Sequence, residues 1–205
     1  VPEDKDIISV VVEDGSLVAV CEEVLSYMRS SIPETVTTTI LLSAGSFLYS
    51  EEEFHNAPPD YLASLENKLK RNTETVLYKL NNEVKKRGGK LLVATLIPLP
   101  RCLQEEAVYK KFLARCYKLM NDTIWKLNQA SDVHTPSLRK IVEYKKGVIL
   151  GTNQPKFFHQ KSYRDLYHPN QDTQRKLMAM CVKSLEKVAS NFRTDYHHYM
   201  KLGCT

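Results

Sequence analysis

The stretch that decides the fold is VLYKLNNEVKKRGGKLLVATLIPLP, residues 76–100. Its first half has apolar residues at helical spacing, and Gly88-Gly89 is a typical helix stop. Residues 90–97 then form an apolar run that Pro98-Leu99-Pro100 closes, which predicts a strand. A long helix that leads into a strand is typical of a βαβ unit, so this stretch predicts a parallel sheet.

The same alternation extends over the whole chain. Strands are predicted at residues 7–12, 35–42 and 90–97, and one more within 132–150. The helices between them are predicted to bury four apolar faces: Leu17, Val20, Cys21, Val24, Leu25 and Met28; Leu62, Leu65, Leu69, Val76, Leu80 and Val84; Val108, Phe112, Cys116, Leu119, Ile124 and Leu127; and Leu177, Met180, Cys181, Leu185 and Val188. This pattern predicts an α/β fold with a mainly parallel sheet, formed by residues 1–205 as a single domain.

Composition bounds the function. With 42% hydrophobic and 26% charged residues, the 205-residue chain reads as an ordinary globular protein. No apolar run approaches the roughly 18 residues of a membrane span, and Val1–Asp4 does not resemble a signal peptide. The net charge of +5 permits binding to nucleic acid or to an anionic membrane surface.

The five cysteines are odd in number and form no C-x-x-C pair, which favours core thiols in a reducing compartment over disulfides. Cysteine and histidine spacings match no zinc pattern, and His197-His198 is not expected to bind metal. No cofactor is expected.

Two segments near predicted strand ends carry residues of hydrolase chemistry. Ser16 follows the first predicted strand and precedes a helix, where it serves either as a nucleophile or simply as a helix cap. Asp165 lies three residues before His168, just before the last helix. An Asp-x-x-His pair can supply the base and its orienting carboxylate for a serine nucleophile, although a structural histidine turn is the plainer interpretation.

On these residues the chain resembles the SGNH (GDSL-type) hydrolase family, which implies a three-layer α/β/α sandwich. Asp165-x-x-His168-Pro-Asn is similar to the final block of that family. The nucleophile block is rearranged to Asp14-Gly15-Ser16-Leu17, and Gly45-Ser46-Phe47-Leu48 stands where the family has Gly-x-Asn-Asp. Loss of one oxyanion donor costs about 2.7–4 kcal/mol, so we expect no enzyme activity, with Ser16, Asp165 and His168 as remnants.

A degenerate SGNH-like domain of this length and layout also resembles the OSK-domain family of insect germ-plasm proteins. That resemblance implies a cytoplasmic, non-catalytic module that binds mRNA untranslated regions in germ-plasm ribonucleoprotein granules. It also implies germ-plasm proteins as possible partners, and neither a small-molecule substrate nor a membrane span.

Basic residues interleave with aromatic ones at residues 156–164, a combination that holds single-stranded RNA through phosphates and stacked bases. A solvated loop with Phe157 and Phe158 packed in the core is the competing interpretation. The predicted RNA contacts are Arg101, Lys145, Lys146, Lys156, Lys161, Arg164, Arg175 and Lys176.

Two other basic runs have simpler explanations. Lys85-Lys86-Arg87 complements the dipole at the end of its helix, and Lys110, Lys111 and Arg115 form a solvated helix face. The alternatives to RNA binding are a serine esterase or acyl hydrolase, and a protein-interaction scaffold.

Overall fold

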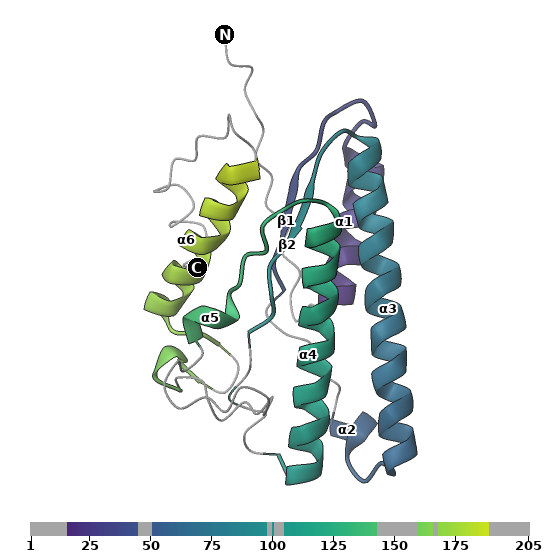
Figure 1. The fold of residues 1–205 in the computed structure, drawn as a ribbon, viewed down its shortest axis with the longest axis vertical. Helices are drawn as coiled ribbons and strands as arrows, with labels where there is room; N and C mark the ends of the chain where they lie inside the picture. Colours follow the sequence, from purple (N-terminus) through teal and green to yellow (C-terminus); the bar gives the residue numbers. More distant parts are fainter. Residues whose placement is uncertain are drawn as a thin grey trace.

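The structure is a computed structural model, and it describes residues 16–44, 51–97, 100, 105–142, 160–165 and 168–188. The described chain is mostly helical with a small parallel sheet, a mixed α/β arrangement (Figure 1). Its elements are α1 (Leu17–Ser31), β1 (Ile40–Leu42), α2 (Glu51–Phe54), α3 (Pro59–Lys86), β2 (Leu91–Val93), α4 (Ala107–Ala130), α5 (Arg139–Val142), the 3-10 turn η3 (Gln160–Ser162) and α6 (Gln171–Val188).

The parallel pairing predicted around residues 76–100 is confirmed. β1 pairs with β2 in parallel, with Ile40 opposite Leu91 and Leu42 opposite Val93, and α3 lies between the two strands in the chain. Side chains alternate across the pair, as they do in any strand. Leu42 and Val93 join a core with α1, α3 and α4, whereas Leu41 packs on the other side.

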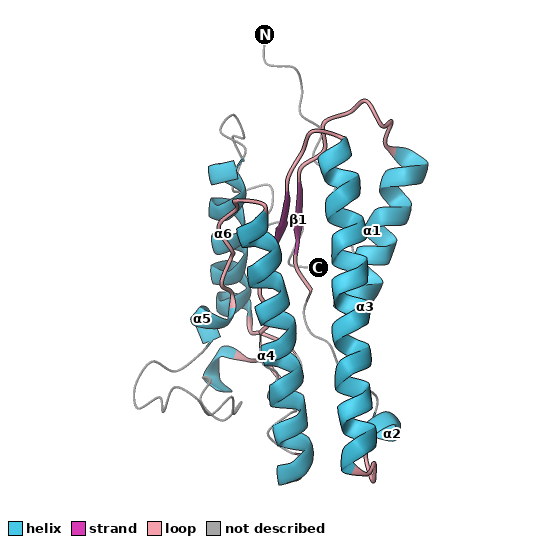
Figure 2. Ribbon diagram, turned by 45° about the vertical axis from the view of Figure 1, so that its right-hand side comes forward, coloured by secondary structure: helices cyan, strands magenta, loops and turns pink. Residues whose placement is uncertain are grey.

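Helices therefore lie on both sides of the strand pair. Figures 1 and 2 show α6 on one side and α1 and α3 on the other. The smaller apolar cluster joins Ala94 and Ile97 to α5, α6 and Tyr163. The sheet thus separates a large helical side from a small one.

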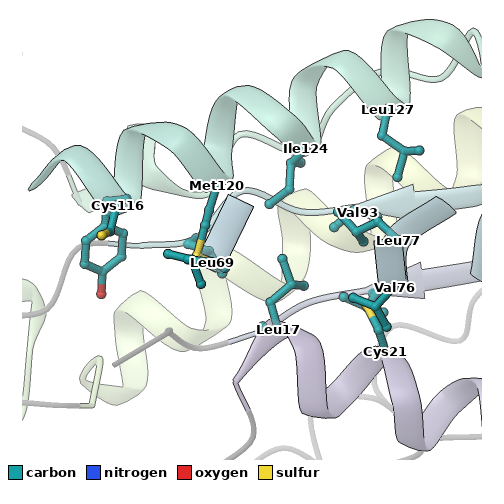
Figure 3. Packing of buried hydrophobic residues seen from close by; sticks show 14 of the residues in the cluster. Leu17, Cys21, Leu69, Val76, Leu77, Val93, Cys116, Met120, Ile124 and Leu127 are labelled. Carbon is teal, nitrogen blue, oxygen red and sulfur yellow. The ribbon is translucent and has the colours of Figure 1, made fainter. Parts of the chain in front are cut away.

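The large side has a closely packed core at the meeting of three helices (Figure 3). Leu17 and Cys21 of α1, Leu77 of α3 and Ile124 of α4 are fully buried in it. The predicted core face of α3 is confirmed at every position, since all six of its residues are buried: Leu62, Leu65, Leu69, Val76, Leu80 and Val84. Spacing of three and four residues keeps these side chains on one stripe of the helix.

The predicted core face of α4 is partly wrong. Val108 is 49% exposed and Leu119 is half-buried, whereas Tyr109 and Met120 are buried. Steps of four residues advance a side chain about 40° beyond a full turn, so the predicted series drifted off the stripe that faces the core.

The predicted helix stop at Gly88-Gly89 is confirmed, and the two glycines act differently. Gly88 has a φ of 72°, the left-handed conformation that ends many helices. Gly89 passes so close to the preceding segment that an added Cβ would lie 1.7 Å from the carbonyl oxygen of Thr38. Only glycine fits there without movement of the backbone.

Arg87 corrects the interpretation of the run Lys85-Lys86-Arg87 as a set of dipole-complementing cations. Its side chain is buried, and its guanidinium donates to the carbonyl oxygens of Ile32 at 2.7 Å, Pro33 at 3.0 Å and Met28 at 3.1 Å. These carbonyls belong to the end of α1 and the turn after it, where that of Met28 also accepts the N–H of Ile32 at 3.2 Å and that of Pro33 the N–H of Val36 at 3.1 Å. The bonds to Met28 and Ile32 tie the end of α3 to α1, and the same guanidinium lies 3.4 Å from a carboxylate oxygen of Glu83, which is also on α3.

Both observed strands are shorter than predicted. Residues 35–39 do not join β1, because Val36 donates its N–H to Pro33 in a turn and leaves its own side chain exposed. Residues 94–97 are buried but lie beyond the end of β2. The first predicted strand, 7–12, lies outside the described residues.

No strand forms in the described part of 132–150, which ends at Val142. The far edge of β2 is instead covered by side chains of α4. Asn128 accepts from the N–H of Val93 at 3.2 Å and donates to its carbonyl oxygen at 2.8 Å, and Asn121 accepts from Leu96 N–H at 2.8 Å. These amides replace backbone partners that buried N–H and C=O groups need.

Candidate functional site: the loop before helix α6

Ser16 lies where the sequence places it, at the start of α1. Its Oγ accepts a hydrogen bond from the N–H of Ala19 at 3.2 Å, the geometry of a helix N-cap. Within the described residues this is the one hydrogen bond of that hydroxyl, so none joins it to His168. The arrangement is that of a structural cap.

Asp165 and His168 form the pair that the Asp-x-x-His spacing predicts. Nδ1 of His168 lies 2.9 Å from Oδ2 of Asp165, and the backbone N–H of His168 donates to Oδ1 at 2.7 Å. The pair is open to solvent, with side chains 43% and 58% exposed, respectively. A carboxylate on Nδ1 orients an imidazole as in a catalytic pair, but the same bonds also simply close the turn.

This turn is part of a loop held firmly against the first turn of α6. Tyr163 and Pro169 form an isolated antiparallel bridge, and Arg164 N–H donates to the carbonyl of His168 at 2.8 Å. Asn170 then joins loop to helix. Its amide donates to the carbonyl of Lys161 at 2.7 Å, and its Oδ1 accepts from Thr173 N–H at 2.9 Å, which caps α6.

The loop brings four of the eight predicted RNA contacts to one end of α6. Lys161 and Arg164 lie on the loop, Arg175 and Lys176 lie in the first turns of the helix, and all four side chains are exposed. We call these four residues the α6 basic surface. Its cations converge on the positive end of a helix dipole, an arrangement that favours an anionic ligand.

The cations of the α6 basic surface differ in how far they are neutralised. Lys176 lies 2.7 Å from Asp172, and Arg164 lies 3.5 Å from Asp165. Lys161 and Arg175 form no ion pair with any residue that the structure describes. Lys161 and Arg175 are therefore the least neutralised cations of the α6 basic surface.

The other four predicted contacts, Arg101, Lys145, Lys146 and Lys156, lie outside the described residues. The same holds for the aromatic pair Phe157-Phe158 and for Gly45–Leu48, which stand in the place of the oxyanion block. Tyr163 is described and is buried in the small apolar cluster, so it does not offer a ring for stacking.

The cysteines of the described residues are core residues, as predicted. Cys21, Cys116 and Cys181 are buried free thiols. Burial, with the nearby carboxylate of Glu22, raises the pKa of Cys21 to about 12, and burial alone raises the pKa of Cys181 to about 12. A thiol with so high a pKa is not a thiolate nucleophile at neutral pH.

Sequence reasoning missed a larger group of cations on α3. Lys68, Lys70, Arg71 and Lys79 are exposed along this helix, together with Lys85 and Lys86 at its end. Their signal in the sequence is the span from Lys68 to Lys86, which holds six bases and two acids. Interpretation of Lys85 and Lys86 alone as dipole partners concealed the pattern.

Comparisons with protein-family models, curated proteins and solved structures find no match to the chain. Among the described helices, none has the length and apolar character to cross a membrane. No three His, Cys, Asp or Glu side chains gather as a metal site within the described part of the chain.

Proposed function

We propose that this domain binds RNA without catalysis, and that the α6 basic surface holds the phosphates of single-stranded or looped RNA. The observation that carries the proposal is the bridge and the Asn170 bonds that fix Lys161 and Arg164 beside the first turns of α6. A fixed cation loses less conformational entropy when it binds phosphate than a cation on a free loop.

The finer form of the proposal follows the resemblances of the sequence. The complete domain is then an SGNH-like three-layer α/β/α sandwich of the OSK-domain type. Its ligands are mRNA untranslated regions, and its setting is the cytoplasmic germ-plasm granule. Arg101, Lys145, Lys146 and Lys156 extend the same surface in this proposal.

The test is fluorescence anisotropy with a labelled, unstructured 20-nucleotide RNA at several salt concentrations. We expect a log–log slope of about −0.7 for each phosphate that the protein neutralises. Lys161→Glu with Arg175→Glu should lower the affinity by about tenfold and reduce the slope by roughly 1.4, because both free cations are reversed.

The matched control is Lys126→Glu with Lys183→Glu, which makes the same change in net charge at exposed positions on α4 and on the second half of α6. If the two double variants bind this RNA equally, net charge alone explains the affinity and the proposed surface is wrong. Binding of a protein partner that is insensitive to salt, without RNA affinity, would instead identify a scaffold.

One observation favours a second candidate, a weak serine esterase. Asp165 and His168 form the oriented pair that such an enzyme needs, with Nδ1 of His168 2.9 Å from Oδ2 of Asp165. Against it, Ser16 Oγ is used as a helix cap and has no hydrogen bond to His168. A chromogenic short-chain ester decides between them, since turnover that is lost in Ser16→Ala would establish the enzyme.

A further inference from the structure

Between Lys68 and Lys86, six of the ten exposed residues of helix α3 are cations and none is an acid. Tyr78 is 50% exposed among them. We call this surface the α3 basic face, and it consists of Lys68, Lys70, Arg71, Tyr78, Lys79, Lys85 and Lys86. None of its six cations forms an ion pair with a residue that the structure describes.

Outside α3, four of the thirteen exposed bases that the structure describes form ion pairs. Arg115 of α4 lies 3.1 Å from Glu66, and Lys118 pairs with Asp122. On α3, the acids between Lys68 and Lys86 are Glu74, which has no ion pair in the described chain, and Glu83, which is buried beside Arg87. The α3 basic face therefore lacks the local acids that neutralise other helices.

The helix itself explains only part of this charge. Like charges three or four residues apart weaken a helix, and Lys68 lies three residues before Arg71. The helix dipole accounts for Lys85 and Lys86 in the last turn, but its effect fades within one turn and does not reach Lys79 or Arg71. The charge is therefore explained by a partner of opposite sign.

The shape of the surface indicates which kind of anionic partner fits. α3 is an uninterrupted helix of 28 residues. Arg71, Tyr78 and Lys85 repeat every seven residues, so they form one line with steps of about 10.5 Å, and the face from Lys68 to Lys86 is about 27 Å long. Lys68, Lys79 and Lys86 lie beside this line, and Lys70 lies further round the helix. The result is a convex surface that offers phosphate contacts but, with Tyr78 as its one ring, little stacking for unpaired bases.

We infer that the α3 basic face binds the backbone of a base-paired RNA stem. A stem presents phosphates and 2′-hydroxyls at regular spacing on a stiff rod, and proteins recognise it by shape and backbone contacts. The inference deepens the proposed function, because it assigns stems to α3 and unpaired RNA to the α6 basic surface. The two surfaces lie on opposite sides of the strand pair (Figures 1 and 2), so they hold separate RNA segments.

The experiment compares two labelled RNAs, a 20-base-pair hairpin stem and the unstructured 20-nucleotide RNA, across a salt series. The variant Lys70→Glu with Arg71→Glu should weaken stem binding by about tenfold and reduce its log–log slope by roughly 1.8, if contacts release counterions as in duplex DNA. Its affinity for unstructured RNA should stay within about twofold of the parent, because distant surfaces act independently.

Controls separate charge and folding from contact. Lys126→Glu with Lys183→Glu should leave stem affinity within about twofold of the parent. Lys79→Gln with Lys86→Gln removes two charges without reversing them. Its loss of stem affinity, on a logarithmic scale, should be about half that of Lys70→Glu with Arg71→Glu, and it remains a test even if the glutamate variant folds poorly. Circular dichroism verifies that each variant keeps its helices.

Each outcome decides the inference. Stem affinity equal to that of the charge control would overturn it, and binding of an acidic protein that is lost in the same variant would then identify the partner. Equal loss of both RNAs would also overturn the assignment of stems to α3. A failure of the proposed function can be distinguished from a failure of this inference. In that case, Lys161→Glu with Arg175→Glu would bind unstructured RNA as well as the parent does.

Discussion

The two sides of the strand pair present positive charge in different ways. On the large side, the cations belong to one regular helix, and none of the six on the α3 basic face is paired within the described chain. On the small side, Asp165 and Asp172 contact two of the four cations of the α6 basic surface. Basic residue content is therefore a poor guide to available charge, because nearby carboxylates decide how much of it a ligand meets.

The supports of the two surfaces also differ. α3 is fixed by the large core and by Arg87, which binds carbonyls of α1 and its following turn at long sequence separation. The loop before α6 is fixed by hydrogen bonds between residues that are near in sequence, around Asn170. We expect damage at Arg87 to unfold the domain and damage at Asn170 to remain local.

The largest effect expected is that of Arg87→Met. Removal of the guanidinium leaves the buried carboxylate of Glu83 without its ion-pair partner and the carbonyl of Ile32 without its donor, and loss of one member of a buried pair costs about 3–5 kcal/mol. Urea unfolding monitored by circular dichroism measures the change. A cost below about 1 kcal/mol would show that Arg87 does not anchor α3.

Next in size is an effect of alkaline pH on both sides. Burial raises the pKa of Cys21 on the large side and of Cys181 on the small side from 9.0 to about 12. The unfolded chain then loses these protons first, so their stabilisation is complete below pH 9 and is lost as the pH rises from 9 towards 12. At pH 10, each thiol should lower the free energy of unfolding by about 1.4 kcal/mol.

The test compares the pH dependence, rather than the absolute stability, of Cys21→Ala and Cys181→Ala with that of the parent. Each variant should have a shallower decline of stability between pH 9 and pH 11. If only one variant has the shallower decline, the side of the molecule that holds the other thiol has already unfolded before the ionisation of that thiol affects the free energy of unfolding. The two sides would then unfold separately.

A smaller and local effect is expected for Asn170→Ala. The change removes the cap of α6 and the bond to Lys161, and loss of a cap costs about 1 kcal/mol. Hydrogen exchange should accelerate in the first turn of α6 and stay unchanged in α3. Asn170→Asp is the matched control, because it keeps the acceptor for Thr173 and removes only the donor to Lys161.

The smallest effect expected is a gain. Asp172→Asn frees Lys176 from its ion pair and removes one negative charge from the α6 basic surface. Affinity for unstructured RNA should rise by about twofold, in line with the modest strength of exposed pairs. The same change should leave stem binding unaltered, and an equal gain for both RNAs would argue against two separate surfaces.

The sequence by itself determined the parallel strand pair, the core face of α3, the helix stop at Gly88 and the Asp165–His168 turn. These features depend on the spacing of apolar residues and on hydrogen bonds between residues close in sequence. Both can be predicted from a single sequence. The grouping of Lys161, Arg164, Arg175 and Lys176 near the start of α6 was also predicted, because a short loop before a helix keeps its neighbours together, and their binding of RNA stays a prediction.

The tertiary structure alone decided what depends on distant partners. Arg87 looks like a helix-end cation in the sequence, but Ile32 and Met28 supply carbonyls that draw it inside. Asn128 looks like a surface residue of α4, but it bonds to the edge of β2 that faces away from β1. No strand lies along that edge in the described chain. Whether a polar side chain is buried, paired or free to bind a ligand depends on groups that only folding brings close to it. For the same reason, the α3 basic face was recognised only in the structure, which shows that its cations are exposed and have no ion pair in the described chain.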